Sequence, residues 1–579
     1  MNETDVATAP EFRTLLGTAW ELGGAGREPD EEVAALFEHA ADVFHRRGDC
    51  SGAVTAFTRA AELSAAATPR ARRYGKAALV SGAVVGDLRA AESLLTGAGP
   101  AGTGPAAPPE ATLADSTMVM FSDGDADAAH RLLLAAVEAS DPAAGDPATT
   151  EAMLGTLLLI CHNSGRAELW ETFETYLAKA GHDRYGTWWT RAVLSSNPTR
   201  LDAAALDELD ADIRALSQNR DIAEILRLGS AAAFVDRLPG CRRALRRVAR
   251  LAAGAGAAVS VIYADIELAM EAHATGQWAE AWDRGQEAAR LADERGQRLL
   301  CLEARAVLAA VAADRGDAGP ARAYIDEATA WAVPRGAGFL LGSARHAEVR
   351  LAVATGDFEA AYRAATRISP AGLLAPYETY ALFVHLDLIE AALHTDRPDQ
   401  AAAHSAAVHA SGLARISPRQ RMLVTAGRAL VADDDEAVSL FEAALEVEGT
   451  SPWPFDVARV QLLFGERLRR MREAARARVH LETAIEVFER LGAAPWSARA
   501  AGELRATGQV RVRRSFGTNE ALTPQELEIA LLAAAGLSNK QIGTRLLLSH
   551  RTVGAHLYRV FPKLGINSRA ALRDALAAR

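Results

Sequence analysis

The sequence predicts an all-α protein in which an array of stacked helical hairpins precedes a small four-helix domain. Three observations predict this fold. A Gly-Asp turn recurs at a near-constant interval, and small and apolar residues follow it at helical spacing. The C-terminal segment contains three short stretches that each begin with helix-capping residues. β-Branched residues are sparse and clean alternation of apolar and polar residues is absent, which disfavours strands.

The repeat consists of a Gly-Asp turn, Ala five residues after the Gly, an apolar residue four later and Ala three later. It is complete at two places: Gly48, Ala53, Phe57 and Ala60; and Gly316, Ala321, Ile325 and Ala328. The Gly356-Asp357 turn, followed by Ala361 and Ala365, continues it. Small side chains at fixed positions let two helices pack closely. The pattern resembles tetratricopeptide repeats with a slightly longer period, which implies a tetratricopeptide-like α-solenoid over residues 12–505.

Three stretches interrupt this regular pattern. The Gly/Pro-rich segment from Gly97 to Pro109 is expected to be a long loop, and the segment from Tyr185 to Thr199 to be irregular. Residues 506–517 are expected to link the array to the C-terminal domain at 518–579. Trp188-Trp189 and the pair Trp278/Trp282 either line a concave ligand surface or fill the core between repeats.

The C-terminal helices are marked by their caps. Thr523 and Glu526 are placed to cap a first helix that Gly536 ends, and Ser538 with Gln541 forms a capping box for a second helix. Ser549 caps a third helix, which Gly565 is expected to end. The short turn Leu547-Leu548-Ser549 therefore joins two helices into a helix-turn-helix motif over residues 538–557.

This segment resembles the LuxR-type DNA-binding domain of bacterial transcription regulators. That family shows L-T-x-R-E, G-L-S-N-K-E-I-A, S-x-R-T-V-x-x-H-L and K-L-G, and this chain matches these elements in order and spacing from Leu522 to Gly565. Gln525, Gln541 and Gly543 depart from the family pattern, where Arg, Glu and Ala are usual. Because Gly costs about 1 kcal/mol of helix stability relative to Ala, we expect a slightly looser second helix.

The third helix has two faces. Val553, Leu557, Val560, Phe561 and Leu564 share one face at helical spacing, which predicts a core face. By resemblance, Gly554, Ala555 and Tyr558 on the other face meet base edges. The full set predicted to contact DNA is Ser538, Asn539, Lys540, Arg551, Thr552, Val553, Gly554, Ala555, His556, Tyr558 and Arg559. His556 is as well suited to packing or capping as to binding DNA.

Charge is divided unevenly along the chain. Residues 511–579 hold 11 Lys+Arg and 4 Asp+Glu, a net +7, whereas the rest of the chain holds 52 basic and 70 acidic residues, a net −18. This division suggests that only the C-terminal segment meets a polyanion. We therefore expect double-stranded DNA as a partner, bound by a homodimer because one recognition helix reads few bases.

The array and the domain together resemble large MalT-like LuxR regulators, with the expectation that the ATPase module of those proteins is missing here. The segment containing Trp453, Phe455 and Trp496 is similar to the one that precedes the DNA-binding domain in that group. The resemblance implies a transcriptional regulator whose array senses a protein or small-molecule effector. The alternative is an interaction scaffold that carries a vestigial DNA-binding domain.

Other function classes find no support in the sequence. The Gly75-Lys76 pair lacks the flanking residues of a phosphate-binding loop, because Arg70 and Ala77 replace the required Gly and Ser/Thr. No catalytic or metal-ligand spacing occurs, so we expect no enzyme activity, no cofactor and no metal. No apolar run is long enough to span a membrane, the N-terminus lacks signal-peptide features, and the four cysteines are far apart. A cytoplasmic location is expected.

Overall fold

A computed structural model describes residues 28–46, 48–102, 107–139, 147–180, 182–508, 522, 524–546, 548–564, 566 and 569–577. The chain divides into two compact units, Met1–Ala500 and Ala501–Arg579. Every regular element in the described residues is helical, which confirms the predicted all-α class. None of the helices in these ranges is both long and apolar enough to cross a membrane.

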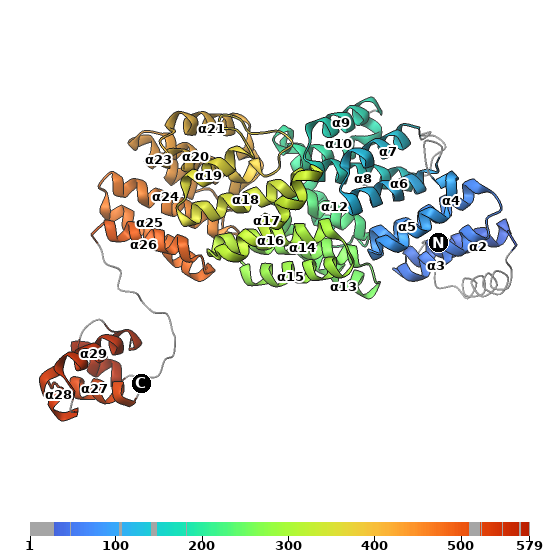
Figure 1. The fold of residues 1–579 in the computed structure, drawn as a ribbon. Coiled ribbons are helices and arrows are strands. Elements are labelled where there is room, and N and C mark those ends of the chain that lie inside the picture. Colours follow the sequence, from blue (N-terminus) through green and yellow to red (C-terminus); the bar gives the residue numbers. More distant parts are fainter. Residues whose placement is uncertain are drawn as a thin grey trace. The chain divides into compact units, whose positions relative to one another are not determined.

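The first unit is a chain of helices in which neighbours in sequence pack against each other (Figure 1). Its first half contains α2 (Glu31–Arg46), α3 (Cys50–Glu62), α4 (Ala67–Leu79), α5 (Leu88–Gly97), α6 (Pro109–Met118), α7 (Ala126–Ala139), α8 (Pro147–Ser164), α9 (Ala167–Ala180), α10 (His182–Ser196), α11 (Ala203–Ala215), α12 (Ile222–Ala233) and α13 (Leu238–Gly254). Its second half contains α14 (Ala258–Ala274), α15 (Trp278–Glu294), α16 (Arg298–Arg315), α17 (Ala318–Ala332), α18 (Gly338–Thr355), α19 (Phe358–Thr366), α20 (Ala381–His394), α21 (Pro398–Ala410), α22 (Pro418–Val431), α23 (Asp434–Leu445), α24 (Pro454–Arg470), α25 (Ala474–Leu491) and α26 (Ala494–Ala506).

The predicted turns occur where the sequence places them. Gly48, Gly316 and Gly356 adopt φ values of 80°, 87° and 79°, the left-handed region that glycine tolerates. The Asp after each Gly is the N-cap residue of the next helix. The side chain of Asp49 accepts a hydrogen bond from the backbone N–H of Gly52 at 2.8 Å. In the same way, the side chain of Asp357 accepts one from the backbone N–H of Ala360 at 3.0 Å. One dipeptide thus ends one helix and caps the next.

The small residues of the repeat lie where helices meet. Ala53 and Ala60 are fully buried and Phe57 is nearly so, and Ala321 and Ala328 are fully buried in the equivalent hairpin. The two helices of a hairpin differ in burial. Helix α16 buries residues on almost every side, whereas α17 buries a single stripe of four. The structure is therefore a tetratricopeptide-like solenoid of paired helices.

The burial pattern separates an inner from an outer layer. Helices α14, α16, α18, α20, α22 and α24 each contact the next member of this series, and α15, α17, α19, α21, α23 and α25 cover them. The inner series brings distant parts of the sequence together. Asp236, in the turn after α12, pairs with Arg419 at the start of α22 at 2.9 Å and accepts a hydrogen bond from Ser417 Oγ at 2.6 Å. Residues about 180 positions apart therefore close one turn of the solenoid.

The last hairpin packs across earlier repeats. Trp496 of α26 is buried and stands edge-on to Phe455 of α24, with ring centroids 5.3 Å apart. The guanidinium of Arg350, on α18, lies over the Phe455 ring at 4.6 Å. At Gly316 an added Cβ would lie 2.3 Å from Pro495 Cγ, so the α16–α17 turn touches the start of α26 closely.

Two expectations about irregular segments need revision. The segment from Tyr185 to Thr199, expected to be irregular, is mostly α10, because Ala192, Val193 and Leu194 are buried in the array and favour a helix there. The segment from Gly97 to Pro109 is a connection, as expected, but it contains a 3-10 turn at Gly99–Gly102. Of the predicted linker, residues 509–517 lie outside the described residues.

The second unit contains α27 (Pro524–Ala534), α28 (Asn539–Leu546), α29 (His550–Lys563) and α30 (Leu572–Ala577). Their apolar faces meet in a core of their own, formed by Ile529, Ala530, Ala533, Ile542, Val553, Leu557, Val560 and Leu572. A self-contained core is what a separately folding domain requires.

The turn glycines provide a test of how closely the last hairpin packs. Replacing Gly316 or Gly356 by Ala places an L-residue at positive φ in both variants, which costs about 1–2 kcal/mol. Only at Gly316 does the new methyl group meet the rigid Pro495 ring, and such overpacking adds about 1–3 kcal/mol. Urea unfolding of the full chain, followed by circular dichroism, should therefore give a lower midpoint for Gly316→Ala than for Gly356→Ala. Equal midpoints would contradict the close packing.

Candidate nucleic-acid interface

The motif begins with a capping box at α28. The backbone N–H of Ser538 donates to Gln541 Oε1 at 2.9 Å, and the backbone N–H of Gln541 points back to Ser538 Oγ at 3.4 Å. Gly536, just before, has a φ of 90° and ends α27 in the left-handed conformation. Both features match the sequence prediction. Thr523 and Gly565, predicted to cap the first helix and end the third, lie outside the described residues.

The turn between α28 and α29 is tight. Ser549 Oγ accepts a hydrogen bond from the backbone N–H of Thr552 at 3.0 Å and so caps α29 as predicted. The backbone N–H of Leu548 donates to the carbonyl of Gly543 at 2.8 Å. A Cβ on Gly543 would lie only 2.5 Å from the Leu548 carbonyl oxygen. The absence of a side chain at Gly543 therefore lets the turn approach α28 closely. This contact was not predicted from the sequence, where only the effect of this glycine on helix stability was considered.

The inward face of α29 forms much of the domain core. Val553 and Val560 are fully buried, Leu557 is nearly so, and Phe561 and Leu564 pack against them half-buried. The predicted core face is thus confirmed. Val553 was also included among the residues predicted to contact DNA, and its complete burial means that it supports α29 rather than facing solvent.

The opposite face carries most of the predicted contact residues. Tyr558 is the most open of them, with 81% of its surface exposed. Gly554 is half-buried and has space around it, since an added Cβ would find its nearest neighbour, Asn539 Nδ2, at 3.7 Å. The other exposed members are Ser538, Lys540, Arg551, Thr552 and Ala555. The side chain of Arg559 lies outside the described part of the chain.

Asn539 and His556 occupy the edges of this face. Asn539 Oδ1 accepts a hydrogen bond from Arg569 Nη1 at 2.7 Å, and Arg569 also donates to the carbonyl of Leu537. Arg569 therefore holds the start of α28 in place, and no local spacing signalled this role because it lies 30 residues away. His556 is half-buried, and its Nδ1 is buried without a hydrogen-bond partner among the described residues.

Two glycines in this domain should respond oppositely to the same substitution. In Gly554→Ala, the new methyl group on α29 has no neighbouring atom closer than 3.7 Å. The variant therefore gains the higher helix propensity of Ala, which stabilises the domain by about 1 kcal/mol. Gly543→Ala would gain the same propensity, but its methyl group collides with the Leu548 carbonyl, so we expect a net loss of stability. Thermal unfolding of residues 515–579 by circular dichroism measures both. A Gly543→Ala domain more stable than the parent would show that the turn gives way easily.

Comparison with known proteins assigns this unit. The sequence model of the family described as "Bacterial regulatory proteins, luxR family" matches residues 520–575. A protein named as an HTH-type transcriptional regulator of Mycobacterium tuberculosis is 46% identical over 69 residues, which are 12% of this chain and 8% of that protein. The nitrate/nitrite response regulator protein NarP of Escherichia coli is 39% identical over 71 residues, 12% of this chain and 33% of NarP. The transcriptional regulatory protein LiaR of Bacillus subtilis is 39% identical over 72 residues, 12% of this chain and 34% of LiaR.

Solved structures similar to the whole chain are distant. The Cut9–Hcn1 hetero-tetramer of the APC/C is 13% identical, with 100% of this chain and 97% of that chain covered and a TM-score of 0.41. Yeast Tom70 is 13% identical, with 76% of this chain and 96% of that chain covered and a TM-score of 0.29. Because these TM-scores are low, we assign the fold of the array from the packing of its own helix pairs and not from these similarities. The sequence relatives named above match 12% of this chain, which covers at most about a third of their own length. Residues 520–575 form a helix-turn-helix domain of the luxR family of bacterial regulatory proteins.

Proposed function

We propose that this chain is a sequence-specific DNA-binding transcriptional regulator, in which α29 reads the major groove and the repeat array senses a protein or small-molecule partner. The observation that carries the proposal is the luxR-family helix-turn-helix at residues 520–575, whose second helix keeps a solvent-facing side. Of the relatives named above, two are named as transcriptional regulators and NarP as a response regulator, which favours regulation over catalysis.

The roles of the residues follow from their position on α28 and α29. Gly554 and Ala555 are small, so the helix backbone comes near the base edges, and Tyr558 projects from the same face. Lys540 and Arg551 are exposed cations at the starts of the two helices, where backbone N–H groups also favour phosphate. Arg559, Thr552, Ser538, Asn539 and His556 complete the set, with Asn539 and His556 acting through local packing.

The assembly on DNA is proposed to be a homodimer in the cytoplasm. One α29 spans few base pairs, and two-fold proteins gain specificity by reading two half-sites about one helical turn apart. The net charge of −18 outside residues 511–579 repels DNA, which leaves the C-terminal unit as the contact. An effector of the array, rather than a catalytic step, supplies the signal.

Phosphate contact by Lys540 is tested by the salt dependence of binding. Lys540→Ala in residues 515–579 should weaken binding to every duplex and reduce the slope of log K against log salt by about 0.9. Arg573→Ala is the matched control, because it removes one cation that lies against the Ala534 carbonyl at the end of α27. The assignment fails if both variants change the slope equally, or if Lys540→Ala leaves it unchanged.

Base-edge contact by Gly554 is tested by adding bulk and negative charge. Gly554→Glu should reduce binding of a selected duplex to the level of unrelated DNA, a loss of about 1,000-fold or more. Leu527→Glu adds the same charge on α27, where the leucine is 42% exposed, and should keep the preference for the selected duplex. The selected duplex comes from sequencing random DNA retained by the parent domain. Wild-type specificity in a folded Gly554→Glu domain would overturn the docking proposal.

A further inference from the structure

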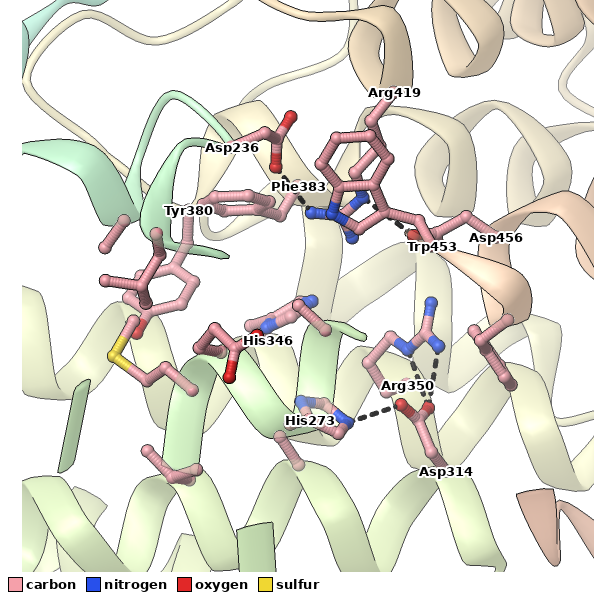
Figure 2. A pocket seen from close by; sticks show the side chains of 18 of the residues that line it. Asp236, His273, Asp314, His346, Arg350, Tyr380, Phe383, Arg419, Trp453 and Asp456 are labelled. Atoms are coloured by element: carbon pink, nitrogen blue, oxygen red, sulfur yellow. Dashed lines mark hydrogen bonds and ion pairs between the residues drawn. The ribbon is translucent and has the colours of Figure 1, made fainter. Parts of the chain in front are cut away.

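The inner layer of the array lines a partly open cavity of about 140 Å³ (Figure 2). Its walls come from α14, α16, α18, α20, α22 and α24, together with Trp278 of α15 and the turn that contains Asp236. These elements span more than 200 residues of sequence. The cavity therefore exists only because one turn of the solenoid closes on itself.

One side of the cavity is held by a charged network around Asp314. His273 Nε2 lies 2.9 Å from Asp314 Oδ2, and Arg350 Nε donates to Asp314 Oδ1 at 2.8 Å. Burial alone would raise the pKa of Asp314, but Arg350 and His273 hold it at about 2. Asp314 is thus a carboxylate whose charge Arg350 balances.

The opposite side is held by Arg419. Its Nη1 lies 2.9 Å from Asp236 Oδ1, and its Nε donates to Asp456 Oδ2 at 2.7 Å. A third cation in the wall, Arg459, pairs with the buried carboxylates of Asp387 and Glu390 at 2.7 and 2.8 Å. Every guanidinium in the wall therefore has a carboxylate partner before any ligand arrives.

This pairing decides which charge a ligand can carry. Arg350 pairs with Asp314, and Arg419 pairs with Asp236 and Asp456. Arg459 pairs with Asp387 and Glu390, and Glu271 pairs with Arg242. A charged ligand would lose its hydration without gaining an uncompensated counter-charge, which is unfavourable. An uncharged ligand meets no such penalty.

The shape and lining of the cavity favour a ring. Tyr380 and Phe383 lie on one side, and Trp278, Trp453 and Phe455 also line it. A cavity of about 150 Å³ holds one benzene molecule, so this volume fits one six-membered ring. Trp278 thus contributes to a cavity wall, while Trp282 packs in a separate apolar cluster and the side chains of Trp188 and Trp189 lie outside the described residues.

Hydrogen-bonding groups remain unused at the cavity. His346 lies between the two charged networks, with its ring 5.5 Å from Tyr380 and 6.2 Å from Phe383, and no described residue hydrogen-bonds to it. Burial, followed by the charge of Arg350, lowers the pKa of His346 to about 3, so the imidazole is neutral. Arg350 uses Nε and Nη2 toward Asp314, and Arg419 uses Nε and Nη1 toward Asp456 and Asp236. Among the described residues this leaves Arg350 Nη1 and Arg419 Nη2 as donors for an oxygen atom.

We propose that this cavity binds one small, uncharged ring compound that carries a hydrogen-bonding oxygen, with His346 as a direct partner of that oxygen. Its role as an effector site of DNA binding rests on the proposed function. Because Asp236 and Arg419 belong to opposite ends of the closed turn, a bound ring contacts both ends. Binding then favours the arrangement of the inner helices in which both ends meet the ligand.

The charge preference is tested with three probes that share one ring. Benzamide is neutral, benzoate is an anion and benzamidine is a cation, and all three are similar in size. Isothermal titration of the full-length chain should give one benzamide per chain, with a Kd at least about tenfold lower than for either charged probe, a difference of about 1.4 kcal/mol. No saturable benzamide binding, or a charged probe that binds as well, would overturn the proposal.

Two variants locate the binding. His346→Phe keeps an aromatic ring but removes its donor and acceptor, and it should weaken benzamide binding by about tenfold or more. His409→Phe makes the same change on the exposed face of α21 and should leave binding unchanged. His346→Gln, which restores a donor and an acceptor, should recover part of the affinity and excludes misfolding as the cause. Equal binding by the parent and by a folded His346→Phe chain would remove the site from this cavity.

A separate readout distinguishes the effector role from the DNA-binding function. DNA affinity of the full-length chain is measured with and without saturating benzamide, and DNA affinity of residues 515–579 is measured alone. A change with benzamide only in the full-length chain supports the effector role, whereas bound benzamide without a change removes that role and leaves the cavity assignment intact. Absence of DNA binding by residues 515–579 would instead remove the proposed function.

Discussion

The contact between Asp236 and Arg419 is the constraint on which the array depends. In a solenoid each repeat contacts mainly its neighbours, so the curvature of the array is ordinarily the sum of the small rotations between successive repeats. Here the buried carboxylate of Asp236, in the turn after α12, binds both Arg419 and Ser417, about 180 residues away in sequence. This long-range contact constrains the total curvature of the array. Removing one member of such a buried pair leaves an uncompensated charge and costs about 3–5 kcal/mol. Each member of the pair is therefore needed to keep the closed turn stable, and with it the geometry of the inner helices.

The same closure explains why the sequence predicts part of this fold and not the rest. The turns at Gly48, Gly316 and Gly356 were predictable because glycine conformation and Asp capping act within four residues. The buried faces were predictable because they recur at helical spacing. The contact between Asp236 and Arg419 could not be predicted from the sequence, because charged residues in loops and at the starts of helices are common. Segment 185–199 was misjudged because burial of Val193 and Leu194, a tertiary effect, outweighs a weak local pattern.

The C-terminal unit shows the same division between local and distant information. Its caps at Ser538 and Ser549, its core face and its exposed face all follow from spacing within one helix. Gly543 was interpreted through helix propensity alone, whereas its neighbour across the turn, the Leu548 carbonyl, determines what fits there. Arg569, which anchors Asn539 and the Leu537 carbonyl, is invisible to spacing because it acts from a different helix. The buried and exposed faces of α29 were thus easier to predict than the residues that hold α28 in place.

A ligand of one ring sets an upper limit on regulation through this array. A ligand that binds only one of two states shifts their equilibrium by RT ln(1 + [L]/Kd), which is about 2.7 kcal/mol at a concentration of 100 Kd. That shift changes the population ratio by about 100-fold, and any affinity for the other state makes it smaller. The Asp236–Arg419 and Asp314–Arg350 pairs form between residues of the chain itself, so they hold the closed turn whether or not a ligand is bound. Its effect must fall on a smaller rearrangement within an already closed array, such as the positions of the inner helices that carry His346, Arg350 and Arg419.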